Sequence, residues 1–99
     1  MKKDSFRDFV LDQLAELDIS ARPMFGAYGL YFRGKFFGII SRGRLYFKTN
    51  EDTRDKYIER GMGPFVVSAK QILKNYYEVP PEIVEDTAEL KIWAQGAIF

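Results

Sequence analysis

With 99 residues, 46% of them hydrophobic and 16% aromatic, the chain is long enough for one domain with a core and too short for a second. It lacks cysteine and histidine, which excludes disulfides, thiolate and imidazole metal sites and the commonest general base. The formal net charge is only +1, yet residues 20–49 hold six basic side chains and no carboxylate, so a basic surface is expected on an otherwise balanced chain.

The first predicted element is an amphipathic helix that runs from Ser5 to Leu17. Asp4 or Ser5 supplies its N-cap, and apolar residues recur at helical spacing, namely Phe6, Phe9, Val10, Leu14 and Leu17. The polar start of the chain lacks the apolar stretch of a signal peptide, and no segment approaches the ~20 apolar residues of a membrane span. We therefore expect a cytoplasmic protein.

Strands separated by glycines follow this helix. Pro23 and the glycines after it exclude a helix here, and a short strand is expected at Arg22–Phe25. Two-residue loops, Arg33-Gly34 and Arg42-Gly43, separate three apolar runs, and such loops favour hairpins because glycine readily adopts the positive φ of a primed turn. The sequence therefore predicts a three-stranded meander over Tyr28–Phe32, Phe36–Ile40 and Leu45–Lys48.

The loops also imply a strand register. Leu30 would face Phe37, Tyr31 would face Phe36, Ile40 would face Leu45, and Ile39 would face Tyr46. One sheet face then holds the uncharged set Tyr31, Phe36, Ile40, Leu45 and Phe47, which we expect to be the core face. The other holds Tyr28, Leu30, Phe32, Phe37, Ile39 and Tyr46 with a basic rim. A bulge near Gly34 or Gly43 would exchange some of these assignments.

The C-terminal half is predicted to add two helices and two strands. Asn50 can cap a helix that Gly61 ends, and Asp86 can cap a last helix at Thr87–Ala97. Between them, Pro64–Val67 and Ile72–Val79 are expected to be strands. The order α-β-β-β-α-β-β-α predicts an α+β fold for residues 1–99. It is a two-layer sandwich in which an antiparallel sheet of about five to six strands has its helices on one face.

Helices on one face would leave the other face uncovered, and contiguous exposed apolar patches usually mark an interface. A protein partner, or self-association, is therefore expected on this surface. The candidate protein interface consists of Tyr28, Leu30, Phe37, Ile39 and Tyr46.

Residues typical of catalytic sites have structural explanations in this sequence. The glycines between residues 26 and 34 precede strands, whereas a phosphate loop precedes a helix. The acidic pairs Glu51-Asp52 and Glu85-Asp86 lie at helix starts, where capping and the helix dipole account for them. The serines have no histidine to activate them. We therefore expect no catalytic residue, metal, cofactor or small-molecule substrate.

The basic segment supports a second hypothesis. Basic side chains interleaved with aromatic residues on a sheet can neutralise phosphates while the rings stack on bases. The candidate nucleic-acid contacts are Arg22, Arg42, Arg44 and Lys48. Such residues also make hairpin turns soluble and protect strand ends, so both interpretations stay open.

Several groups of residues together resemble the signature of the TfoX (Sxy) N-terminal domain family. They are Met24-Phe25-Gly26, Tyr28-Gly29-Leu30-Tyr31 and Gly43-Arg44-Leu45-Tyr46-Phe47-Lys48. The C-terminal part is similar in Tyr77, Val79-Pro80, Glu82, Glu85-Asp86, Leu90 and Trp93-Ala94. Ala27 departs from the pattern, because many relatives have glycine there.

This resemblance implies a two-layer α/β sandwich and brings no established catalytic residue. The best-known members regulate natural competence in bacteria together with the catabolite regulator CRP. They carry a second, C-terminal helical domain, which this chain, ending at Phe99, is expected to lack. The resemblance therefore implies a stand-alone, non-enzymatic regulatory or adaptor domain that acts through protein contacts in transcriptional regulation of DNA uptake.

Overall fold

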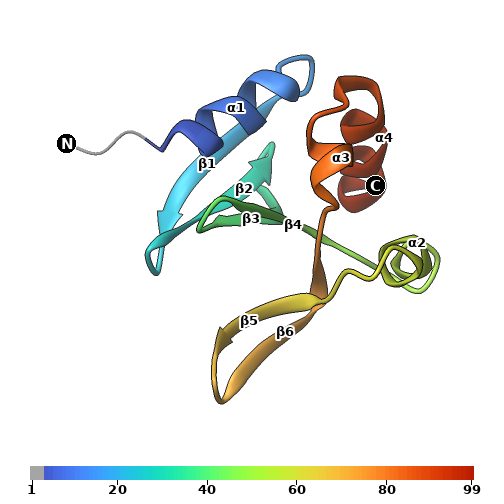
Figure 1. Cartoon of the computed structure of the whole chain (residues 1–99). Coiled ribbons are helices and arrows are strands. Elements are labelled where there is room, and N and C mark those ends of the chain that lie inside the picture. Colours follow the sequence, from blue (N-terminus) through green and yellow to red (C-terminus); the bar gives the residue numbers. More distant parts are fainter. Residues whose placement is uncertain (1–3) are drawn as a thin grey trace.

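The computed structural model describes residues 4–99, which form one antiparallel sheet and four helices (Figure 1). The strands are β1 (Ile19–Met24), β2 (Ala27–Phe32), β3 (Lys35–Ser41), β4 (Arg44–Lys48), β5 (Pro64–Ser68) and β6 (Gln71–Glu78), in the sheet order β1-β2-β3-β4-β6-β5. The helices are α1 (Ser5–Gln13), α2 (Arg54–Glu59), α3 (Pro81–Val84) and α4 (Thr87–Ile98). The α+β class is confirmed, and β1 is longer than expected while α3 was not predicted.

Capping side chains account for the starts of α1 and α4. Asp4 accepts a hydrogen bond from the Arg7 backbone N–H at 2.9 Å, and Asp86 accepts one from Glu89 N–H at 3.1 Å. Asn50 instead caps a turn, because its side chain accepts from the next residues but α2 begins only at Arg54. Among residues 4–99, no helix has both the length and the apolar character needed to cross a bilayer.

Left-handed two-residue turns form the tips of three hairpins. They are Phe25-Gly26, Arg33-Gly34 and Arg42-Gly43, and each has positive φ at both residues. Positive φ at both positions is the geometry of a type I′ turn, whose twist matches that of the strands. The two predicted loops are thus confirmed, and a third joins β1 to β2. Because strands alternate in direction, the tips at Phe25-Gly26 and Arg42-Gly43 lie at the same end of the sheet.

A bulge in β3 overturns one of the four predicted pairs, and Ile40 pairs with Leu45 as expected. Tyr31 pairs with Phe36 and Ile39 with Tyr46 as expected, but Leu30 pairs with Gly38, not Phe37. One extra residue in a strand sends the side chains beyond it to the opposite face. As a result the helix-side core contains Leu30 and Phe37 together with Ile40, Leu45 and Phe47, whereas Tyr31 and Phe36 lie on the other face.

The sheet face away from the helices is not left uncovered. Phe65 of β5 and Leu73 of β6 pack there against Ile39 and Tyr46, which are 0% and 9% exposed. Our expectation of an open apolar face was therefore wrong for Ile39 and Tyr46, whereas Tyr31, Phe36 and Tyr76 are half exposed. The β5–β6 hairpin, which belongs to the same six-stranded sheet, covers part of this face.

This β5–β6 hairpin is fixed to the rest of the sheet at its base. β6 pairs with β4 only from Tyr46↔Glu78 to Lys48↔Tyr76. Next to these pairs, Thr49 N–H donates to the Asn75 carbonyl at 2.6 Å, and Arg54 donates to the Asn75 side chain at 3.1 Å. Beyond this base the hairpin extends away from α3 and α4 (Figure 1).

The bulge assignment can be tested by substituting Phe37. Phe37→Ala should lower the free energy of unfolding by about 3–5 kcal/mol, because it empties a fully buried site in the helix-side core. Ile92→Ala, at a 56% exposed position of α4, should change it by less than about 0.5 kcal/mol. Urea unfolding followed by circular dichroism measures both. Equal losses would contradict the register.

Candidate functional site

A groove of about 820 Å³ lies on the sheet face away from the helices. It runs between the β1–β2 and β3–β4 tips and the β5–β6 hairpin. Its floor is apolar and is built by Phe36, Tyr46, Phe65 and Leu73. The Tyr46 and Phe65 ring centroids are 4.8 Å apart, so the rings of β4 and β5 contact each other in this floor.

Exposed apolar side chains line the sides of the groove. Phe25 at the β1–β2 tip is 96% exposed, and Val66 and Val67 of β5 are 57% and 43% exposed. Single exposed apolar residues are ordinary, but several of them around one hollow are typical of a binding surface.

The charged groups of the groove are all basic. Arg42 and Arg44 line it, and none of the described residues that line it is an aspartate or glutamate. Arg44 forms an ion pair with Glu78 at 3.5 Å, outside the lining. Arg42 makes no ion pair with any residue from 4 to 99. The groove therefore presents apolar surface with a positive end.

Tyr46 on the groove floor is the titratable group most affected by this environment. Burial raises the pKa of the Tyr46 phenol, and the neighbouring Glu78 carboxylate raises it further, while Arg44 opposes both. The phenol is therefore neutral at physiological pH and serves as part of an apolar wall.

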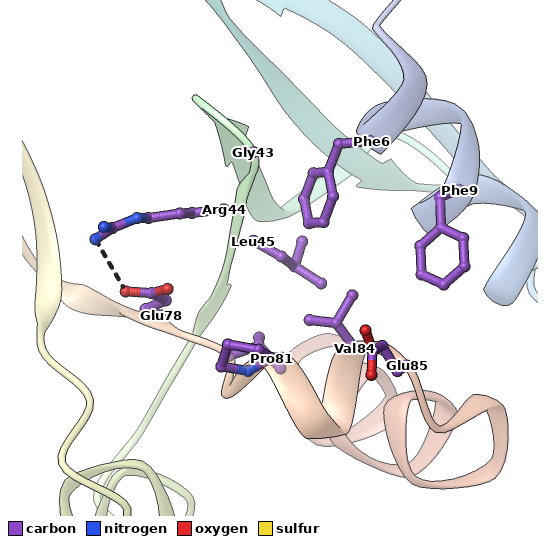
Figure 2. A pocket seen from close by; sticks show the side chains of 10 residues that line it. Phe6, Phe9, Gly43, Arg44, Leu45, Glu78, Pro81, Val84 and Glu85 are labelled. Carbon is purple, nitrogen blue, oxygen red and sulfur yellow. Dashed lines mark ion pairs between the residues drawn. The ribbon is translucent and has the colours of Figure 1, made fainter.

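A smaller hollow of about 310 Å³ lies on the helix side (Figure 2). Phe6 and Phe9 of α1 face Leu45 and Val84 across it, and the Arg44–Glu78 ion pair lies at its edge. Arg44 lines both hollows.

Aromatic rings continue from the groove floor across the same sheet face. Tyr31 lies 5.4 Å from Phe36, and Phe36 lies 5.2 Å from Tyr76, measured between centroids. The Arg22 guanidinium lies over the Tyr31 ring at 5.2 Å, and Lys48 is paired with Tyr76 in the strand register. The result is a half-exposed aromatic row with a cation at each end.

The proposed protein interface of Tyr28, Leu30, Phe37, Ile39 and Tyr46 does not exist as one surface. Tyr28, Leu30 and Phe37 belong to the helix-side core, and Ile39 and Tyr46 lie under the β5–β6 hairpin. The β3 bulge separates the two groups. Of the five, only Tyr46 lines the groove.

The proposed nucleic-acid contacts are all exposed. Strand alternation places Arg22, Arg44 and Lys48 on the face with the aromatic row, and Arg42 at a tip beside the groove. Arg22 on β1 is three strand spacings from Arg44 and Lys48 on β4, roughly 14 Å. They share a face but do not form one cluster.

Sequence reasoning missed the most exposed groove residue, Phe25. The available signal was an apolar residue followed by glycine between two strands, the same pattern as Arg33-Gly34 and Arg42-Gly43. Val66 and Val67 were predicted as strand residues, but no local signal indicates that their strand folds over the groove.

A known protein family matches most of the chain. The family model described as TfoX N-terminal domain matches residues 12–99. The chain belongs to this family. The match includes every strand of the sheet and the residues that line the groove, and the family is a regulatory one and not a known enzyme family. No curated protein matches the chain closely enough to support a comparison.

The buried phenols predict how stability depends on pH. Burial raises the native-state pKa values of Tyr46, Tyr57 and Tyr76, whereas the unfolded-state value is about 10. Their stabilising effect is complete below that pH and is lost as the pH rises above it, because the unfolded chain then releases protons first. Urea melts on either side of about pH 10 should show the decline. Tyr57→Phe should make it shallower, and an unchanged decline would contradict this.

Proposed function

We propose that this chain is a non-enzymatic, cytoplasmic regulatory domain that acts by holding a segment of another protein in the groove. Family membership supports a competence-regulator-like domain, and regulation of DNA uptake is the process we propose for it. The observation that carries the proposal is the groove itself, with its packed apolar floor and its exposed residues Phe25, Val66 and Val67.

The chemistry of the groove favours binding over catalysis. Ser41 is the only aliphatic hydroxyl among the described residues that line it, and the same lining contains no histidine, carboxylate or lysine that would act as a base for it. Packed aromatic residues in a pocket are instead typical of protein-binding hot spots, which lie where surrounding contacts exclude water.

Site-specific photocrosslinking in the cells that make the protein tests this proposal. A benzophenone side chain at Val66 should form an adduct with another protein, because Val66 lines the groove. The matched control is Ile92, which is exposed to a similar degree on α4. The adduct should be absent there. No adduct from Val66, or the same adduct from both positions, would contradict the proposal.

A second candidate function, binding of single-stranded nucleic acid, is favoured by the aromatic row. Tyr31, Phe36 and Tyr76 form a half-exposed row between Arg22 and Lys48, and the Arg22 guanidinium lies over the Tyr31 ring. Stacking of successive bases on such rings contributes about 1–3 kcal/mol per base.

Fluorescence anisotropy with a labelled single-stranded oligonucleotide tests this candidate. Affinity should fall steeply with salt because phosphate contacts release counterions. Arg22→Ala should weaken binding, and Tyr31→Leu should weaken it without reducing the salt dependence. Arg60→Ala removes a cation at the C-cap of α2, outside this face, and serves as the control. Absence of binding at low salt excludes the candidate.

A further inference from the structure

The residue that the folded chain explains least is Phe25. The three hairpin tips share one left-handed geometry, and two of them carry arginine, which solvent accommodates easily. The third carries phenylalanine at φ 49°, a region that bulky side chains rarely adopt. Its ring is 96% exposed, so it gains almost no burial in return. Such an outlier in an observed structure is a reason to look for a function.

The position of Phe25 in the groove lining indicates a binding function. It lines the groove together with Val66 and Val67, which come from β5 and are also exposed. An aromatic side chain on a two-residue turn at the edge of a hollow can pack against a bound apolar segment. Because the side chain has only two χ angles, it loses little conformational entropy on binding. The groove and Phe25 together therefore favour an apolar ligand segment.

The positive charge of the groove indicates which charge the bound segment carries. The groove has Arg42 and Arg44 at the end that Phe25 occupies, and the described residues of its lining include no carboxylate. Arg42 lacks an ion-pair partner within residues 4–99. A basic segment would meet like charges, whereas a segment with carboxylates beside its apolar residues would be complementary.

We propose that the groove binds an acidic, apolar segment of a partner protein and that Phe25 is its anchoring contact. This inference rests on the proposed function and specifies its partner. The carboxylates of the segment pair with Arg42, and its apolar side chains lie between Phe25, Val66 and the aromatic floor.

Selection of peptides on the intact chain tests the partner chemistry. A display library of short random peptides is panned against the immobilised protein, and selected peptides are synthesised with a fluorescent label. We expect them to combine aromatic or aliphatic residues with aspartate and glutamate. Selection of basic peptides, or of peptides without charge bias, would overturn the proposal.

The variant Phe25→Asn separates a binding role of Phe25 from a structural role. Asparagine is a preferred residue for this turn, so the melting temperature should rise by a few degrees while affinity for the selected peptide falls at least about tenfold. If Phe25 instead had only a structural role, Phe25→Asn would lower the melting temperature. The folded variant would then bind the selected peptide as tightly as the original chain does. Undiminished peptide binding by Phe25→Asn would overturn the proposal.

A matched pair of charge reversals tests the arginine. Arg42→Glu should weaken the acidic peptide at least about tenfold, with the largest effect at low salt. Arg33→Glu reverses the same residue type in the same turn geometry at the opposite end of the sheet, and it should leave affinity unchanged. Equal effects of the two would overturn the proposal.

The outcomes separate this inference from the proposed function. If Val66 still crosslinks another protein in cells but Phe25→Asn does not reduce the adduct, the groove binds a protein and the inference fails. If Val66 crosslinks nothing, the proposed function fails as well. Concentration-dependent dimers that Phe25→Asn abolishes would identify a second copy as the occupant and overturn the acidic segment.

Discussion

The bulge in β3 is the constraint on which the rest of this structure depends. Side chains alternate along a strand, so one extra residue decides which aromatic rings meet the helices. Phe37 thereby enters the helix-side core, and its neighbour Phe36 joins the opposite face. Gly38 permits this arrangement, because a Cβ there would lie 3.0 Å from the Tyr46 carbonyl oxygen. Both the core and the groove floor follow from that single local choice.

Local signals in the sequence predict what depends on neighbouring residues. The arginine–glycine turns and the caps at Asp4 and Asp86 were predicted correctly because each is determined within four residues. The strand faces were not, since nothing local to Phe37 distinguishes a bulge from regular pairing. The groove was missed for a related reason. Phe25 and Val66 are far apart in the chain and come to line one hollow only after the β5–β6 hairpin folds over.

The uneven distribution of charge along the sequence becomes an uneven surface in the fold. The segment without carboxylates forms nearly all of β1 to β4, and every acidic residue lies before β1 or after β4. One face of the domain is thus basic and aromatic although the whole chain is nearly neutral. The groove and the aromatic row share Phe36. A protein segment and a nucleic-acid strand would therefore compete for the same surface.

The attachment of the β5–β6 hairpin has a consequence for local stability. Its pairing with β4 is limited to the segment from Tyr46↔Glu78 to Lys48↔Tyr76, and the cluster it covers is smaller than the helix-side core. Backbone amides in such a peripheral unit exchange with solvent through partial opening, at a free energy below that of global unfolding. The width of the groove is therefore governed by a local equilibrium, and any occupant that bridges the hairpin to β3 slows amide exchange in β6.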